Sequence, residues 1–128
     1  MPRVPDIRDA HFPGRAPIDT YGNGGFRFAD MSHRGSLLCL PSGIYGWSME
    51  EGAPLDIEAF ERVIAEAADF EFLLVGTGHT IRPLPAALKA AFRARGISAD
   101  PMGTGAAIRT YNIMLGEQRP VAAALIAV

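Results

Sequence analysis

The stretch FEFLLVGTGHTIRPLPAALKAAF, residues 70–92, decides the fold of this chain of 128 residues. Its residues 72–75 form a continuous apolar run, which is typical of a strand that is buried on both faces of a sheet. The run ends at a Gly-Thr-Gly turn, residues 76–78, and a helical pattern follows. Pro85 near the first turn and Gly96 at the stop position favour a helix over residues 84–96. We therefore predict a buried strand that leads into a crossover helix.

The remainder of the second half continues this alternation. The sequence predicts a strand over residues 97–102, a helix over 104–115 with Thr104 as N-cap, and a last, central strand over 121–128. Upstream, residues 56–69 predict another helix, with Asp56 as its N-cap. This order of elements requires crossover connections and at least partly parallel pairing of the strands.

The first half of the chain has the pattern of short strands. We expect strands at residues 18–21, 26–30, 36–40 and 44–48, with turns at 22–25 and 31–35, as in a β-meander or a pair of hairpins. Residues 1–17 contain several Pro and Arg residues and predict an irregular surface arm. The predicted architecture is a single compact α/β domain over residues 18–128, with a mixed central sheet, about three helices and a β-rich N-terminal half.

The composition excludes several classes of protein. Apolar residues make up 48% of the chain, which supports a core without disulfides. The net charge is −2, so the chain lacks the basic excess typical of nucleic-acid binding or of attraction to acidic membranes. The longest apolar run, residues 121–128, is shorter than the ~20 residues of a membrane-spanning helix. The single cysteine, Cys39, lies among leucines and predicts a buried thiol in a reducing compartment, which favours the cytoplasm.

Four segments in combination resemble one small family. They are IDTYGNGGFRF from Ile18, GSLLCLPSGIYGW from Gly35, LLVGTG from Leu73, and RGISADPMGTGAAIRTYNIMLGEQRPVAAALI from Arg95 to Ile126. The family is the domain of the mitochondrial NADH dehydrogenase (complex I) assembly factor 3. The same domain occurs in the adipogenesis-associated domain protein and in bacterial proteins of unknown function.

The resemblance implies a compact α/β domain with a mixed sheet and helices against it. It implies no enzymatic activity, and it implies a role as a partner in the assembly of respiratory NADH dehydrogenase. Because the sequence shows no mitochondrial targeting extension, it resembles a bacterial, cytoplasmic version of the family. Such a protein would make at most peripheral contact with a membrane complex.

Two glycine turns, at residues 76–78 and 102–105, define the hypothesis of a ligand site. If the strands before them are parallel, both turns lie at one edge of the sheet, where open α/β sheets bind ligands. The candidate ligand-binding residues are Gly76, Thr77, Gly78, His79, Thr104, Gly105 and Arg109. The competing interpretation is a tight structural turn, because the third glycine of the dinucleotide fingerprint and the GxxxxGK[ST] motif are both missing.

His79 is the one histidine beside this edge and is a candidate acid or base. The sequence shows no carboxylate or nucleophile partner for it, so the sequence favours a protein that is not an enzyme and predicts no catalytic residue. The three histidines and the cysteine lack metal-ligand spacing, and we expect no metal and no cofactor.

Five residues are candidates for a protein interface: Tyr21, Tyr45, Trp47, Tyr111 and Asn112. Large aromatic residues anchor interfaces when they are exposed. When they are buried they belong to the core, which is favoured for Tyr45 and Trp47. For Tyr111 the alternative is packing with a tethered hydroxyl, and for Asn112 it is a hydrogen bond to the backbone of a neighbouring loop.

Two functions are therefore considered. The first is a protein-binding or assembly module, whose surface docks a protein partner or a second copy of the chain. The second is a small-molecule or anion-binding protein, or an enzyme, that uses the Gly-Thr-Gly edge. The near-neutral charge and the missing nucleophile–base pair favour the first.

Overall fold

The last strand of the chain lies in the interior of a six-stranded sheet. A computed structural model describes residues 10–128, and the strand order of this sheet is β1-β6-β5-β9-β7-β8. The six strands are β1 (Ala10–Phe12), β5 (Ser36–Leu40), β6 (Gly43–Trp47), β7 (Phe72–Gly76), β8 (Ser98–Met102) and β9 (Val121–Leu125). All five residues of β9 are buried, which explains why its sequence is apolar without alternation.

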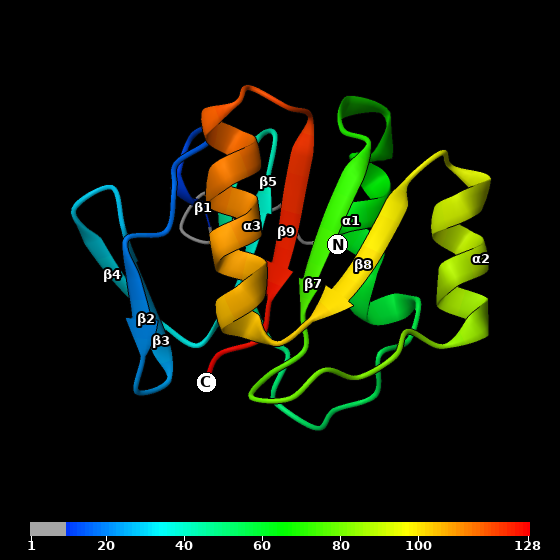
Figure 1. Cartoon of the computed structure of the whole chain (residues 1–128), viewed down its shortest axis with the longest axis horizontal. Coiled ribbons are helices and arrows are strands. Elements are labelled where there is room, and N and C mark those ends of the chain that lie inside the picture. Colours follow the sequence, from blue (N-terminus) through cyan, green and yellow to red (C-terminus); the bar gives the residue numbers. More distant parts are fainter. Residues whose placement is uncertain (1–9) are drawn as a thin grey trace, which may run out of the picture.

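The C-terminal half forms the predicted crossovers. Strand β7 pairs in parallel with β8 on one side and with β9 on the other. Helix α2 (Ala86–Ala94) connects β7 to β8, and helix α3 (Thr104–Gly116) connects β8 to β9. Figure 1 shows α3 in front of the sheet and α1 (Glu61–Ala65) behind it. The sheet is therefore covered on both faces, and the domain is of the α/β class.

The N-terminal half supplies the antiparallel strands. Strand β5 pairs with β6 as a hairpin and also with β9, so the main sheet is mixed. A separate three-stranded sheet contains β2 (Thr20–Gly22), β3 (Gly25–Phe28) and β4 (Met31–Arg34). The β2–β3 turn has positive φ angles at Asn23 and Gly24, which is the geometry of a two-residue hairpin turn. Of the two predicted alternatives, the pair of hairpins is confirmed, as β2–β3 and β5–β6.

The turn expected at residues 31–35 is wrong. Residues Met31–Arg34 form β4, which pairs with β3 in antiparallel register. The chain reverses earlier, at Ala29 and Asp30, where both φ angles are positive (48° and 62°). This pair lacks the Asn-Gly or Asp-Gly signal that usually marks such a turn, so the sequence does not indicate the reversal. The predicted strand over residues 26–30 therefore ends two residues later than β3 does.

The arm expected over residues 1–17 also needs correction. Residues Ala10–Phe12 form the edge strand β1, which pairs with β6. Ala16 is buried, and its carbonyl accepts a hydrogen bond from the Tyr111 hydroxyl. The segment from residue 10 onward is therefore part of the packed domain, while the part of the prediction on residues 1–9 lies outside the described residues.

The single helix expected over residues 56–69 is wrong, because the segment is broken into three short pieces. They are η2 (Glu58–Phe60), α1 and η3 (Ala67–Asp69), where η denotes a 3-10 turn. Asp56 accepts a hydrogen bond from the Ala59 N–H (2.9 Å), as a capping residue does. The Ala59 carbonyl accepts the Trp47 indole N–H (2.8 Å), and this contact coincides with the break after η2.

Two hydrophobic clusters fill the space on the two faces of the sheet. The first lies under η2, α1 and α2 and includes Phe60, Leu88 and Phe92. The second lies under α3 and the small sheet and includes Phe26, Phe28 and Tyr111. The predicted buried thiol is confirmed: Cys39 belongs to the second cluster, and burial raises its pKa to about 12.

Candidate functional site

The two glycine turns meet at the carboxyl ends of β7 and β8, as the parallel pairing predicts. The Thr77 N–H donates to the Met102 carbonyl (2.8 Å), and the Gly78 N–H donates to the Thr104 hydroxyl oxygen (3.0 Å). A Cβ on Gly76 would lie 3.0 Å from Thr104 Cα, so the glycine allows the start of α3 to approach β7 closely. Thr77 and Thr104 therefore lie at one rim of the sheet.

Both threonine hydroxyls form hydrogen bonds to the backbone around this rim. The Thr77 hydroxyl accepts from the Arg82 N–H (2.9 Å) and donates to the Thr80 carbonyl (2.7 Å), which folds the loop after β7 onto itself. The Thr104 hydroxyl donates to the Ile126 carbonyl (2.7 Å). The predicted capping role of Thr104 is wrong, because Gly103 occupies the N-cap position and no side chain caps α3. Both threonines are fully buried.

A hollow of about 330 Å³ lies over the first turn of α3. Five of the seven candidate ligand-binding residues line it: Gly78, His79, Thr104, Gly105 and Arg109. Gly76 and Thr77 do not, because they lie beneath the rim. The hollow also contains Tyr21 from the small sheet, and a Cβ on Gly105 would collide with the Tyr21 hydroxyl. Tyr21 therefore bends over the N-terminus of α3 and forms one wall.

His79 has a carboxylate partner that the sequence did not reveal. Its Nδ1 lies 2.8 Å from Glu51 Oε1, and its backbone N–H donates to the same carboxylate. The His79 backbone N–H, and then its imidazole, hold the pKa of the Glu51 carboxyl below its usual value. Glu51 lies 28 residues away in the loop after β6, so no motif spacing connects the two. Gly78 has a φ of +115°, a backbone conformation that favours glycine.

Several groups around the hollow are of kinds that commonly contact anions. The first-turn amides of an α-helix have no acceptor within the helix, and its N-terminus carries a partial positive charge. Gly105 and Ala106 occupy that turn in α3, and the exposed Arg109 adds a full positive charge. The Tyr21 hydroxyl and the imidazole of His79, held by Glu51, supply further polar groups.

The five interface candidates have different surroundings. Tyr21 is 43% exposed. Tyr45 and Trp47 are half-buried against the first cluster, with Arg62 over the Tyr45 ring and Trp47 edge-on to Phe60 at 5.2 Å. These two aromatics hold the broken helical segment on the sheet.

Tyr111 and Asn112 fasten the N-terminal segment to α3. The Tyr111 side chain is buried and its hydroxyl donates to the Ala16 carbonyl (3.2 Å). The Asn112 amide donates to the Ile18 carbonyl (2.8 Å) and accepts from the Ile18 N–H (2.9 Å). The predicted tethered hydroxyl and the predicted bond to a neighbouring loop are both confirmed.

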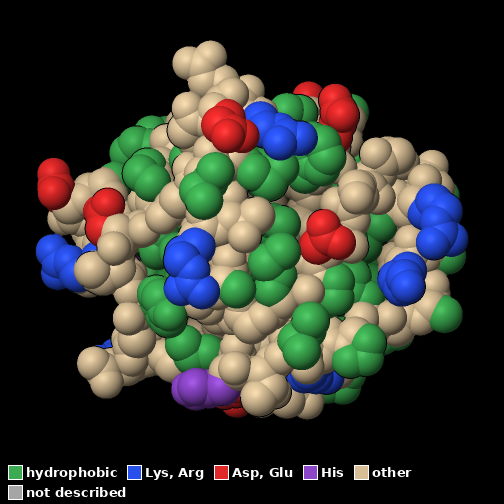
Figure 2. Space-filling view, in the orientation of Figure 1, with side chains coloured by type: hydrophobic (Ala, Val, Ile, Leu, Met, Phe, Trp, Pro, Cys, Tyr) green, Lys and Arg blue, Asp and Glu red, His purple; other side chains and the backbone are tan. Residues whose placement is uncertain are grey.

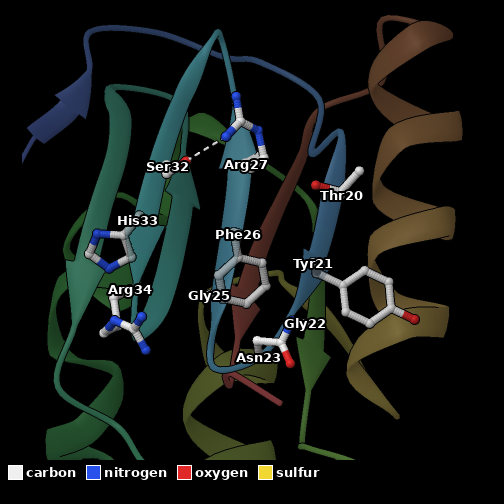
Figure 3. A pocket seen from close by; sticks show the side chains of 10 residues that line it. All are labelled: Thr20, Tyr21, Gly22, Asn23, Gly25, Phe26, Arg27, Ser32, His33 and Arg34. Atoms are coloured by element: carbon white, nitrogen blue, oxygen red, sulfur yellow. Dashed lines mark hydrogen bonds between the residues drawn. The ribbon is translucent and has the colours of Figure 1, made fainter.

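A second hollow, of about 470 Å³, lies on the three-stranded sheet (Figure 3). Its floor contains Gly22 and Gly25, and Arg27 donates across it to the Ser32 hydroxyl (2.9 Å). Tyr21 also lines this hollow, and its ring extends toward α3 in the same view. The hollow is shallow and solvent-facing, and two arginines, Arg27 and Arg34, give it a positive character.

Within the described residues there is no group of three or more His, Cys, Asp or Glu side chains that could hold a metal ion. The same part of the chain contains no helix that is long and apolar enough to cross a membrane. On the face that carries α3, basic and acidic side chains are scattered among hydrophobic ones, without a continuous basic stripe (Figure 2).

Several known proteins are similar to this chain. An uncharacterised protein of Rhodobacter capsulatus is 40% identical over 93% of this chain and 90% of its own length. The NADH dehydrogenase 1 alpha subcomplex assembly factor 3 of mouse is 29% identical over 94% of this chain. This chain spans 65% of the length of that mouse protein.

The fold is also found in solved structures. The crystal structure of a protein from Bartonella henselae, described as an outer membrane protein, matches with a TM-score of 0.88 and 57% identity. The match covers 92% of this chain and 99% of that one. A family model described as a protein of unknown function (DUF498/DUF598) matches residues 18–126. This chain therefore belongs to the DUF498/DUF598 family, which the resemblance in its four segments had indicated.

Proposed function

We propose that this chain is a protein-binding module that takes part in the assembly of respiratory NADH dehydrogenase. The observation that carries the proposal is the similarity to assembly factor 3, which extends over 94% of the chain and is therefore not confined to one motif. Several vertebrate assembly factors of the same name match over 85% or more of the chain. The shared part is the whole folded domain, so a shared surface is the simplest basis for a shared role.

The chemistry of the rim supports a binding role over a catalytic one. The hydroxyls of Thr77 and Thr104, which are the buried polar side chains nearest the hollow, are bonded to the backbone of the chain itself. A nucleophile requires a neighbouring base and a free approach to the substrate. These threonines have neither, and His79 is exposed with its carboxylate partner at the surface.

The proposed place of action is the cytoplasm, with peripheral contact to the membrane-bound enzyme. A single buried thiol with a raised pKa is inert toward oxidation, as is common in proteins of a reducing compartment. Cell fractionation tests this part of the proposal: the chain should be found in the cytoplasmic fraction, and a smaller share should sediment with membranes until high salt is added.

The test of the assembly role is affinity purification of the tagged chain from its native cell, followed by mass spectrometry. Subunits of the NADH dehydrogenase should be recovered, and deletion of the gene should lower the amount of assembled enzyme in a native gel. A control purification with the tag alone identifies nonspecific proteins. Normal enzyme levels in the deletion strain, with no subunits recovered, would contradict the proposal.

A second candidate function is the binding of a small anion at the rim. The observation that favours it is the convergence of Arg109, the first turn of α3 and Tyr21 on one hollow. Titration with inorganic phosphate, followed by amide NMR shifts, tests it. The Gly105 and Ala106 signals should move in the native chain and stay unchanged in Arg109→Gln. The matched control, Arg95→Gln, changes an exposed arginine that lies outside the hollow and should bind as the native chain does.

A further inference from the structure

An apolar groove of about 580 Å³ lies between the segment before α1 and the start of α2. Its walls are mostly carbon: Pro54, Leu55 and Ile57 on one side, and Pro85 and Leu88 on the other. Ile57 is 45% exposed, although an isoleucine at this level of exposure loses the stabilisation that burial would provide. The groove lies on the face of the sheet opposite α3, away from the rim described above.

The outer surface of α2 extends this apolar area. A helix on the surface of a protein usually presents polar side chains to solvent. Helix α2 instead exposes four alanines, Ala86, Ala87, Ala90 and Ala94, while Leu88 and Phe92 fill the core beneath. The distance between two packed helices depends on the side chains at the contact, and alanines allow a short one. Groove and alanines together form a smooth, weakly polar area that another helix can approach.

Opposite charges lie on the two sides of this area. Residues 50–71 contain eight of the 14 acidic residues and one basic residue, Arg62. Residues 82–95 contain four basic residues and no acidic one. Glu58 lines the groove on the α1 side, whereas Lys89 and Arg93 lie on the side of α2 that faces β8. We call Glu58 and Glu61 the acidic row, and Lys89 and Arg93 the basic row. The order across the surface is then acidic row, groove, alanines, basic row.

Glu51, Asp56, Glu66 and Arg82 have partners within residues 10–128. The four side chains of the acidic and basic rows have no ion pair within the same residues, where the ion pairs are His79–Glu51 and Arg119–Glu117. Glu58, Glu61, Lys89 and Arg93 are all exposed. Exposed charges are well solvated, so their separation costs little in the monomer. They are, however, arranged so that the surface is complementary to itself.

We propose that this surface, formed by η2, α1 and α2, is the interface of a symmetric dimer of this chain. A two-fold axis that runs between the groove and the alanines, along the direction of α2, places the acidic row of one copy opposite the basic row of the other. The same operation places the alanines of each α2 against the groove of the other copy. Each contact occurs twice, as in any isologous interface. Complementary rows of charge fix the register and the alanines with the groove supply the apolar centre.

The second copy is favoured over a different partner because both signs of charge are present on the one surface. A purely basic or purely acidic partner would meet an unfavourable row on one side of the groove. A copy of the same chain meets favourable charges on both sides. The dimer does not depend on the assembly role, since it forms from the purified chain alone.

Sedimentation velocity of the purified full chain tests the dimer, from micromolar to millimolar concentration. The native chain should show a concentration-dependent dimer that weakens as salt is raised, because screening shortens the range of the charge rows. Ala90→Arg places a large charged side chain at the centre of the alanines and should weaken association at least tenfold. The matched control, Ile113→Arg, adds the same side chain at an exposed helical position on the opposite face and should leave association unchanged.

Charge reversal on the two rows is the decisive experiment for the dimer. Glu58→Lys with Glu61→Lys makes both rows basic, and Lys89→Glu with Arg93→Glu makes both rows acidic, so each variant alone should be monomeric. An equimolar mixture should dimerise again, because each row then meets its opposite. Recovery in the mixture also shows that both variants fold. A native chain that stays monomeric at millimolar concentration, or reversed variants that dimerise alone like the native chain, would overturn the proposal.

Discussion

The rim at the carboxyl ends of β7 and β8 and the surface of α1 and α2 differ in how their polar groups are used. At the rim, the hydroxyls of Thr77 and Thr104 are buried and bonded to the backbone of the chain. On the surface of α1 and α2, Glu58, Lys89 and Arg93 lie around an apolar groove and have no ion-pair partner among residues 10–128. The first region therefore contributes to stability, and the second is available for contact with another molecule.

The largest effect that tests this comparison is expected from Thr104→Val. Valine has nearly the same shape but cannot bond, so the Gly78 N–H and the Ile126 carbonyl both lose a buried partner. We expect a loss of about 2–4 kcal/mol in the free energy of unfolding, measured with urea. Thr110→Val, in the same helix and half-buried, should change it by less than about 0.5 kcal/mol. Equal effects of the two substitutions would show that the rim does not depend on its hydroxyls.

The next effect concerns close packing at the same rim. Gly76→Ala places a methyl group 3.0 Å from Thr104 Cα and 3.2 Å from a Leu125 methyl, and neither the helix backbone nor the buried leucine yields easily. We expect a loss of about 1–3 kcal/mol in the free energy of unfolding. Gly116→Ala, at the end of α3 where a Cβ meets nothing, should instead stabilise the chain slightly. A neutral Gly76→Ala would mean that the rim is more loosely packed than this geometry indicates.

Much of this rim could be predicted from the sequence because its elements carry strong local signals. The apolar run before residue 76, Pro85 and the glycine turns define strand, helix and crossover, and parallel pairing then places both turns at one edge. The partnership of His79 with Glu51 could not be predicted. It depends on where the loop after β6 lies in space, and no pattern in the sequence records a separation of 28 residues.

Two other predictions are wrong: the single helix over residues 56–69 and the turn at residues 31–35. The segment 56–69 has helical periodicity, but Trp47 binds the Ala59 carbonyl and the Glu66 carboxylate binds Ser42, so tertiary contacts divide it into short turns. At Ala29 and Asp30 the backbone takes the left-handed conformation without a glycine. In the segment 56–69, contacts made by distant segments override local propensity, which a single sequence does not reveal. At Ala29 and Asp30, the residue types do not signal the left-handed conformation.

A smaller effect is expected where the rim meets solvent. Because the pKa of Glu51 is lower in the folded chain than in the unfolded chain, its bonds to His79 stabilise the fold above the unfolded pKa. That contribution is lost as the pH falls through the folded pKa. The melting temperature of the native chain should therefore fall more steeply than that of Glu51→Gln between about pH 6 and about pH 3. Glu50→Gln, which changes a neighbouring exposed carboxylate without such bonds, should follow the native chain. Parallel curves for native and Glu51→Gln would exclude a stabilising pair.

The smallest effect is expected on the surface of α1 and α2. Ile57 is 45% exposed at the mouth of the groove, so Ile57→Ala in dilute solution should change the free energy of unfolding by about 0.5 kcal/mol or less. Leu55, two residues earlier, is buried in the first cluster, and Leu55→Ala should cost about 2–5 kcal/mol. The difference between these two losses of unfolding free energy distinguishes a buried core side chain, Leu55, from a solvent-facing one, Ile57. If Ile57→Ala were as destabilising as Leu55→Ala, the groove would be part of the core, and neither surface contacts nor a second copy would be needed to explain its apolar walls.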